Sequence, residues 1–430
     1  MVKPHIVGDF LRVGRGRHAL ALFALITSAH AAEPLAWLPA NLPALPADGP
    51  VLCVRDYLTE AQGKAVLDAA VAEFSTQEKW DAYASLLRER VQQGAGLAPW
   101  PRRTALNPIV HSRREYDGYS VENVAFESIP GYFVGGNLYR PLKAKGLRPA
   151  ILTTHGHTGP LTSAESWSKH GRFTDTVQLR SATLARMGAV VLAIEMFGYG
   201  DSTEQLGREA HRTTAAMSMQ IWNARRALDF LESLPGVDRH RIGVTGESGG
   251  GTQTFLLAAL DSRVAVSAPV VMVSAYFFGG CPCESGRPIH RSADHFASNA
   301  MLAALAAPRP QGVVSVGGDW SKNTPQVEFP FLRHVYGLSG AEKNLTNDHF
   351  PTEGHNFGPS KRQAVYRLMH RRLGLDGAVV RDAHGQIDES AVTIEPADAL
   401  RTWTAARPLP AHALRSVDAV LETLQQLQQP

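Results

Sequence analysis

The chain is predicted to fold as an α/β protein, with a mostly parallel central sheet that carries helices on both faces. Short apolar runs such as 150–154 and 189–194 alternate with helical patterns, as is typical of strands buried on both faces. A glycine-rich turn joins a strand at 241–247 to a helix that starts after Ser248. Polar and glycine-rich loops follow these strands, at the edge where parallel sheets bind ligands.

The individual elements follow from periodicity and from turn residues. An unbroken helical pattern covers 58–92, and two strands between Val121 and Pro141 meet at Pro130-Gly131 as a hairpin. Further strands are expected at 150–154, 189–194, 241–247, 264–273 and 312–316, and helices at 176–187, 211–234, 249–260, 327–336 and 360–373. After the last of these helices we expect an accessory strand at 392–395 and a helix at 416–427.

The first 31 residues are typical of a secretory signal peptide. A positive region with four basic residues precedes the apolar run Ala19–Thr27, which is too short to span a bilayer. The tripeptide Ala29-His30-Ala31 has the small-x-small pattern of a cleavage site. We therefore expect cleavage after Ala31, leaving 399 of the 430 residues in the periplasm or outside the cell.

The charge balance argues against polyanionic partners. The whole chain has a formal net charge of +3, and the predicted signal peptide carries all of that excess. The remainder has no polybasic segment and no further apolar stretch long enough to cross a membrane. Nucleic acid and anionic membranes are therefore poor candidate partners. The oligomeric state stays open.

Three cysteines are present, Cys53, Cys281 and Cys283. An exported protein can oxidise one pair. Cys281 and Cys283 flank a proline and are awkward to join to each other, whereas Cys53 with either of them is geometrically possible. The choice between these two pairs, and free cysteines as the alternative, stay open.

Metal binding is not expected from the spacing of the histidines and cysteines. The Cys-x-Cys segment has His290 and His295 nearby, and His155 and His157 form a second pair two residues apart. Neither set reaches the ligand number and spacing of a recognisable zinc motif. We therefore expect no metal, no cofactor and no effect of chelators on activity.

The G-x-S-x-G frame Gly246–Gly250 is the pattern of a nucleophile elbow. The glycines let the backbone bend sharply so that the hydroxyl of Ser248 stands clear of the sheet. The N–H of Gly249 then points at an oxyanion, and the loop at His155–His157 is expected to supply a second donor, the N–H of His157. The alternative is a glycine-rich turn with an ordinary serine.

A nucleophilic serine needs a base, and the base needs an acid that orients it. Asp319 follows the strand at 312–316, and His355 lies 36 residues later in a loop, which reproduces the order serine, acid, histidine. His349 is the rival base. Glu284, after the preceding strand, is the alternative acid or a carboxylate that orders the pocket wall.

Together these residues resemble the α/β-hydrolase superfamily, and within it the acetyl-xylan-esterase-like carbohydrate esterases and their dienelactone-hydrolase-like and prolyl-oligopeptidase-like relatives. The resemblance covers roughly 118–373 and rests on the stretches 130–141, 155–157, 197–202, 246–250 and 354–355. It implies Ser248 as nucleophile, Asp319 as acid and His355 as base. The region before the core is too short for the propeller of full prolyl oligopeptidases.

The expected protein is an exported serine esterase that hydrolyses a small acyl ester, carbohydrate-linked by resemblance, through an acyl-enzyme. Its expected organisation is a signal peptide at 1–31, a helical extension at 32–117, a catalytic domain at 118–373 and an accessory segment at 374–430. Two alternatives stay open. One is a peptidase or amidase with the same three residues, and the other is a binding protein that has the fold without the activity.

Overall fold

The computed structural model describes residues 35–430, apart from 46–48, 144–145 and 159–162. The predicted signal peptide at 1–31 lies outside these residues. Within them, no helix is both long and apolar enough to cross a membrane.

In the described part of the chain, nine strands form one sheet in the order β1-β2-β3-β5-β4-β6-β7-β8-β9. The strands are β1 (Ile109–Tyr116), β2 (Tyr119–Ile129), β3 (Tyr132–Pro141), β4 (Arg148–Thr154), β5 (Val190–Ile194), β6 (Val237–Glu247), β7 (Val264–Val270), β8 (Gln311–Val316) and β9 (Leu345–Phe350). The first three are antiparallel, and β3 also pairs antiparallel with β5. The pairs from β5 through β4 to β9 are all parallel. The predicted mostly parallel α/β sheet is therefore confirmed.

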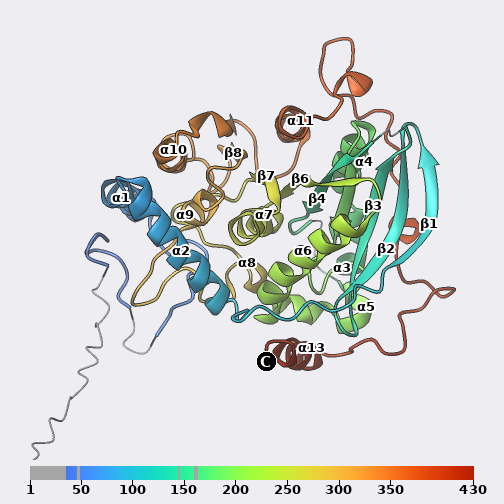
Figure 1. The fold of residues 1–430 in the computed structure, drawn as a ribbon, viewed down its shortest axis with the longest axis horizontal. Helices are drawn as coiled ribbons and strands as arrows, with labels where there is room; N and C mark the ends of the chain where they lie inside the picture. The colour runs from blue at the N-terminus through green and yellow to red at the C-terminus, as the bar shows by residue number, and fades with distance from the viewer. Residues whose placement is uncertain (1–34, 46–48, 144–145, 159–162) are drawn as a thin grey trace, which may run out of the picture. The chain divides into compact units, whose positions relative to one another are not determined.

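The helices cover the sheet on both sides (Figure 1). The longer ones are α1 (Glu60–Glu73), α2 (Gln77–Gly94), α4 (Asp175–Arg186), α6 (Ala215–Ser233), α7 (Gly249–Leu260), α10 (Glu328–Leu338), α11 (Pro359–Leu373) and α13 (Val417–Gln426). The shorter ones are α3 (Ala164–Lys169), α5 (Ser202–Leu206), α8 (Pro282–Ser285), α9 (Asn299–Ala304) and α12 (Ala397–Leu400). Short 3-10 turns occur at 171–173, 208–212, 342–344 and 378–380.

The side chains of successive residues on a strand point alternately into two apolar layers of the core. On β4, Leu152 belongs to the cluster under α6 and α7, whereas Ile151 belongs to the cluster under α4 and α11. This is the expected result of successive side chains pointing to opposite faces of a strand. Both faces are therefore buried, which explains why the parallel strands have continuous apolar sequences.

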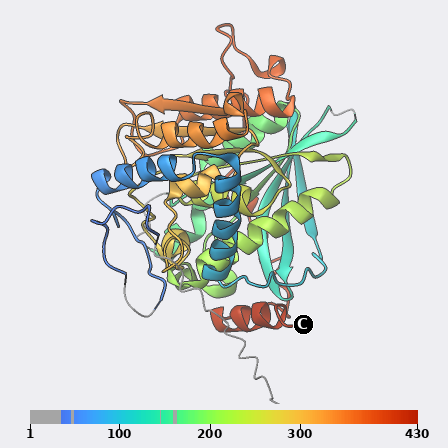
Figure 2. The ribbon, with the colours of Figure 1, turned by 60° about the vertical axis from the view of Figure 1, so that its left-hand side comes forward.

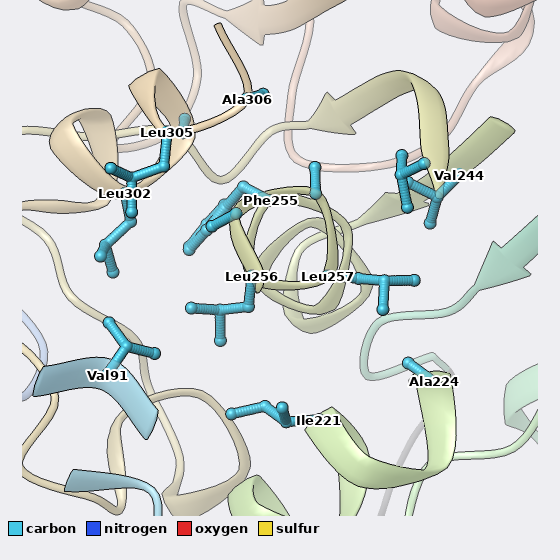
Figure 3. Packing of buried hydrophobic residues seen from close by; sticks show 14 of the residues in the cluster. Val91, Ile221, Ala224, Val244, Phe255, Leu256, Leu257, Leu302, Leu305 and Ala306 are labelled. Carbon is cyan, nitrogen blue, oxygen red and sulfur yellow. The ribbon is translucent and has the colours of Figure 1, made fainter. Parts of the chain in front are cut away.

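Helix α7 is enclosed by apolar side chains, so its position is well determined by packing. Figure 3 shows Phe255, Leu256 and Leu257 among side chains from β6 and from helices α2, α6 and α9. All three are at most 2% exposed. Because the candidate nucleophile immediately precedes α7, this packing holds the turn at the end of β6 in place.

The predicted helix at 58–92 is two helices, α1 and α2, which Figure 2 shows as separate blue segments. The break occurs at Thr76, whose side chain accepts a hydrogen bond from the N–H of Lys79 and so caps α2. Thr59 caps α1 in the same way, as part of a capping box. Helical periodicity continues through the break, which is why the pattern concealed it.

The edge strands β1 and β9 were not predicted. Their residues are largely half-buried or exposed, and apolar and polar side chains are mixed along them without a continuous apolar run. The predicted accessory strand at 392–395 was wrong. There the backbone bonds to side chains instead of to a strand, with the N–H of Thr393 donating to the Tyr119 hydroxyl and the N–H of Glu395 to the Gln178 side chain. The predicted C-terminal helix is α13, which contacts β2.

Candidate active site

The turn between β6 and α7 holds Ser248 in a backbone conformation that side chains rarely adopt. Its φ is 56° and its ψ is −122°. The N–H of Ser248 donates to the carbonyl of Val270 on β7 at 3.0 Å, and the N–H of Thr252 donates to the Ser248 carbonyl at 3.0 Å. These two bonds support the strained turn. The strand, turn and helix therefore have the geometry of a nucleophile elbow.

Two glycines let the loop after β4 touch the elbow. A Cβ added at Gly156 would lie 2.7 Å from the carbonyl oxygen of Glu247 and 2.8 Å from Cβ of Ser248. A Cβ added at Gly250 would lie 2.9 Å from the carbonyl carbon of His155. Both distances are too short for a real side chain. The contact places the loop that carries His157 beside the elbow, and His157 and Ser248 line the same pocket.

Gly249, one of the two predicted oxyanion residues, lies next to the side chain of the other, His157. Gly249 is the first residue of α7, so its N–H belongs to the turn that has no acceptor within the helix. A Cβ added at Gly249 would lie 3.5 Å from Cε1 of His157. The positive end of α7 also favours negative charge at this point. The place beside Ser248 is therefore suited to a developing oxyanion.

Asp319 and His355 meet across the end of β8. Nδ1 of His355 lies 2.7 Å from Oδ2 of Asp319. Because a carboxylate only accepts, Nδ1 carries the hydrogen and Nε2 presents a lone pair. The N–H of Ser321 donates to Oδ1 of Asp319 at 2.6 Å and fixes the carboxylate. The Asp319 side chain is 3% exposed and that of His355 is 32% exposed, so the base faces solvent.

An aromatic pair connects His355 with the pocket in front of Ser248. The Trp320 ring lies 4.5 Å from the ring of His355 and stacks on Phe277 at 3.9 Å. The pocket measures about 330 Å³ and is lined by Arg55, His157, Ser248, Phe277, Gly280, Cys281, Glu284 and Trp320. Within the described residues, no hydrogen bond joins Ser248 to His355. Arg55 had no sequence signal as a pocket residue, because it precedes the core by many residues.

The other candidate acid and base have different partners. Oε2 of Glu284 accepts a hydrogen bond from the N–H of Gly280 at 2.6 Å, and its Oε1 lies 3.6 Å from Nδ1 of His157. Nδ1 of His349 lies 2.9 Å from the hydroxyl of Ser315. The arrangement thus places Glu284 in the pocket wall and pairs Asp319 with His355.

A larger cavity of about 520 Å³ lies elsewhere, beside the start of β4, where Arg148, Arg241 and Gly374 are among its lining residues. It opens near the amino end of β4. Ligands of open parallel sheets bind at the carboxyl ends. That other edge carries Ser248 and Gly249 after β6, His157 after β4, Asp319 after β8 and His355 after β9. The smaller pocket is therefore the better candidate site.

The cysteines are paired differently from the expectation. Cys281 and Cys283 are joined to each other, and Cys53 is free and buried. The judgement that Cys281 and Cys283 are awkward to join was wrong, because the turn that starts α8 brings the two sulfurs together on the same side, and neither pairing considered for Cys53 occurs. Burial raises the pKa of the Cys53 thiol to about 12, so it is uncharged.

The structure also brings together two histidines that the sequence analysis did not connect with each other. His157 and His211 gather around Cys281 and Cys283, with their donor atoms all within 4.8 Å of one another. His290 and His295, considered from the sequence, bond instead to the Asn299 side chain and the Ile289 carbonyl. His211 carried no spacing signal, because it lies 54 residues from His157 and 70 from Cys281.

His155 is a structural residue, although the sequence considered it with His157 as a metal pair. Its Nδ1 lies 2.8 Å from the Gly156 carbonyl, and its Nε2 accepts a hydrogen bond from the N–H of Met196 at 3.2 Å. Burial lowers its pKa to about 3, so the ring stays neutral. It links the loops after β4 and β5.

Comparison with known proteins identifies the family. The structure named "Methylesterase BT1017" is 40% identical, covers 87% of this chain and 82% of its own, and superposes with a TM-score of 0.77. A family model described as "Glucuronyl esterase, fungi" matches residues 208–278, which include the elbow. A structure described as a "putative acetyl xylan esterase" from Bacteroides fragilis shares the fold, with 16% identity, a TM-score of 0.50, and coverage of 76% of this chain and 92% of its own.

Two curated proteins match in part. "Putative hydrolase YtaP" of Bacillus subtilis is 34% identical over 145 residues, and "Uncharacterized protein PA2218" of Pseudomonas aeruginosa is 31% identical over 142 residues. Each match covers 33% of this chain, and the matches span 47% and 34% of the relatives' own lengths. The chain belongs to the α/β-hydrolases, in the esterase family that includes Methylesterase BT1017.

Proposed function

We propose that the protein is a serine esterase in which Ser248, His355 and Asp319 form the catalytic triad. The observation that carries this proposal is the 2.7 Å contact between His355 and Asp319 at the edge of the sheet where Ser248 stands on its elbow. The three residues occur in the chain order of this fold. The segment 118–373 is the proposed catalytic part of the chain.

In the proposed reaction, Nε2 of His355 takes the proton from the Ser248 hydroxyl as the oxygen attacks the ester carbonyl. Asp319 holds the proton on Nδ1 and stabilises the imidazolium that forms. The N–H groups of Gly249 and His157 stabilise the oxyanion. His355 then protonates the leaving alcohol, and water hydrolyses the acyl-enzyme.

A small carbohydrate-linked ester is the proposed substrate. The pocket of about 330 Å³ is near the lower end of the range for ligand sites. Its stacked Phe277 and Trp320 offer an apolar face of the kind that packs against a sugar ring, and Arg55 adds a cation at the pocket. The methylesterase relative makes a methyl ester the first substrate to test, beside acetyl esters.

The test is an ester panel on purified protein, with methyl esters of sugar acids, acetylated sugars, long-chain esters and a peptide substrate in parallel. We expect the small esters to be cleaved fastest. Ser248→Ala should lower kcat by about 10³-fold or more, with residual catalysis from the oxyanion hole. A fluorophosphonate should label Ser248 in the parent protein.

Several outcomes would count against the proposed small-ester esterase. A folded Ser248→Ala variant that keeps most of its activity would remove the nucleophile. Preference for acyl chains of about ten carbons or more would reject a small-ester pocket. Faster cleavage of the peptide would favour the amidase alternative, and absence of both labelling and turnover would favour a binding protein.

A further inference from the structure

Four donor atoms beside the candidate active site converge on one point. Nε2 of His157 lies 2.9 Å from Nε2 of His211, and 3.3 Å from the sulfur of each of Cys281 and Cys283. Nε2 of His211 lies 3.7 Å from the sulfur of Cys281. The donors come from three separate places: the loop after β4, the turn at 208–212 and the start of α8. A set of two imidazoles and two sulfurs is the ligand set of a Cys₂His₂ zinc site.

The tautomer of His211 is set for ligation. Its Nδ1 lies 2.7 Å from the carbonyl oxygen of Phe197, which can only accept. Nδ1 therefore carries the hydrogen, and Nε2 directs its lone pair at His157 and Cys281. Histidines that bind metals usually have such a partner on the other ring nitrogen, which fixes the ring and its tautomer.

The other ring nitrogen of His157 faces a carboxylate. Oε1 of Glu284 lies 3.6 Å from its Nδ1, and Glu284 is itself held by the N–H of Gly280. Nε2 of His157 faces Nε2 of His211 at 2.9 Å and is also the nitrogen nearest both sulfurs. The same nitrogen of each ring is therefore directed at the centre of the group.

The nitrogen–sulfur spacing fits tetrahedral ligation, whereas the two sulfurs are bonded to each other in this structure and must separate to become ligands. Bonds of about 2.0–2.1 Å to nitrogen and about 2.3 Å to sulfur place tetrahedral ligands roughly 3.3–3.8 Å apart. The nitrogen–sulfur separations of 3.3 Å and 3.7 Å lie in this range. The nitrogen–nitrogen separation of 2.9 Å needs only a small outward shift of one ring. Soft sulfur and imidazole donors favour zinc over magnesium or calcium.

We propose that, when Cys281 and Cys283 are reduced, His157, His211 and the two cysteines bind one Zn²⁺. A thiol reductant or a phosphine supplies two electrons, and with two protons these convert the disulfide into two thiols. Each thiol then loses its proton to solvent as its thiolate binds the ion. The disulfide and the zinc-bound dithiolate are thus two alternative states of the same pair.

The site would be structural. Four protein ligands complete a tetrahedral shell and leave no position for water or substrate. The ion would tie together the three loops that carry the ligands, including the loop whose His157 also lines the pocket with Ser248. The serine chemistry itself stays independent of metal, so the site is separate from the proposed catalytic function.

The test measures metal content. Folded protein is reduced with a phosphine, the thiols are confirmed by intact mass, and Zn²⁺ is titrated in competition with a chromogenic chelator. Bound zinc is then counted by elemental analysis, and its ligands are examined by X-ray absorption. The variants are the double change Cys281→Ser with Cys283→Ser, the single change His211→Gln, and two matched controls, Cys53→Ser and His290→Gln.

We expect one tightly bound zinc per reduced chain, with both sulfur and nitrogen in its first shell, and none on the disulfide form. The double serine variant and His211→Gln should lose at least about 100-fold in affinity, whereas Cys53→Ser and His290→Gln should keep it. Ser248→Ala should also keep it, which separates this proposal from the esterase.

Equal zinc binding by the double serine variant, or no binding by the reduced parent protein, would overturn the proposal. A disulfide that survives reduction in the folded protein would overturn it too, because the thiolates would then never be available. Circular dichroism of each variant identifies any that has failed to fold, and Co²⁺ absorption from thiolate charge transfer provides a second readout on the parent protein.

Discussion

At the scale of single residues, the arrangement around His355 distinguishes two acids that the sequence left open. Asp319 contacts Nδ1 of His355 and has its other oxygen held by Ser321. Glu284 instead contacts Gly280 and faces His157. The two carboxylates are directed at different histidines, so their contributions should separate cleanly by mutation.

Asp319→Asn should therefore be far more damaging to ester hydrolysis than Glu284→Gln. An amide at position 319 can donate to Nδ1 and so stabilise the wrong tautomer of His355, which costs on the order of 10⁴-fold in kcat in a triad. Glu284→Gln should cost about 10-fold or less. Steady-state kinetics on a small ester measures both. If the Glu284 variant proves the slower enzyme, the acid has been assigned to the wrong strand.

A second residue-scale prediction concerns Glu328, at the start of α10. It is fully buried, and its Oε1 accepts a hydrogen bond from the N–H of Ala275 at 2.8 Å. Burial raises its pKa to about 7. The folded protein keeps a proton that the unfolded chain releases above about pH 4.5, so this group lowers stability as pH rises from there to about 7, by roughly 3 kcal/mol in all.

Glu328→Gln should remove that pH dependence. Urea unfolding of parent and variant at pH 5 and pH 8 gives the comparison. The free energy of unfolding of the variant, relative to the parent, should increase between the two pH values. A difference that stays constant would mean that Glu328 is ionised in the folded protein throughout the range.

At the scale of elements, the active edge depends on the contact between the β4 loop and the elbow. Gly156 allows this contact, since any Cβ there would overlap Glu247 and Ser248. Helix α7 is held in place, because its apolar side chains pack against β6 and against helices α2, α6 and α9 (Figure 3). A Cβ at position 156 would therefore displace the loop after β4. That loop carries His157, the proposed oxyanion donor.

Gly156→Ala should lower kcat by on the order of 10²-fold, because a displacement of about 1 Å is enough to misplace the oxyanion donor. It should also cost about 1–3 kcal/mol of stability through overpacking. Gly354→Ala is the matched control, since a Cβ at Gly354 meets nothing within 4 Å. Kinetics and chemical denaturation of both variants are needed. Equal effects in the two would show that the tight contact is unimportant.

At the scale of the whole molecule, the chain divides into a sheet that builds the site and peripheral segments that pack on it. Helices α1 and α2 lie before the sheet in sequence, yet α1 contacts α10 and α2 contacts α7. Arg55, just before α1, reaches the pocket. The N-terminal segment thus contributes to the site as well as to the core.

Export is a prediction for the whole chain. Expressed in a Gram-negative host, the mature protein should begin at Ala32 and be found in the periplasm or medium, because the charged start, apolar run and cleavage tripeptide occur in the required order. N-terminal sequencing and cell fractionation measure this. Cytoplasmic protein that retains Met1 would contradict it.

The sequence by itself determined the fold class, because buried parallel strands and surface-covering helices have distinct apolar periods that can be read locally. It also located the elbow, since a sharp turn between strand and helix requires glycines at fixed positions around Ser248. Chain order and the ends of predicted elements led to Asp319 and His355 as the proposed acid and base, and the structure places these two side chains in contact. Such signals can be recognised in the sequence without knowledge of the tertiary structure.

Only the tertiary structure decided which distant groups meet. The approach of His211 to His157 and the entry of Arg55 into the pocket depend on loops that no periodicity describes. The conformation of the turn at α8 likewise decided that Cys281 pairs with its near neighbour Cys283. The choice of Asp319 over Glu284 as the partner of His355 depends likewise on side-chain direction. Contacts between loops far apart in sequence follow from how the elements pack, and packing is a property of the whole chain rather than of any segment.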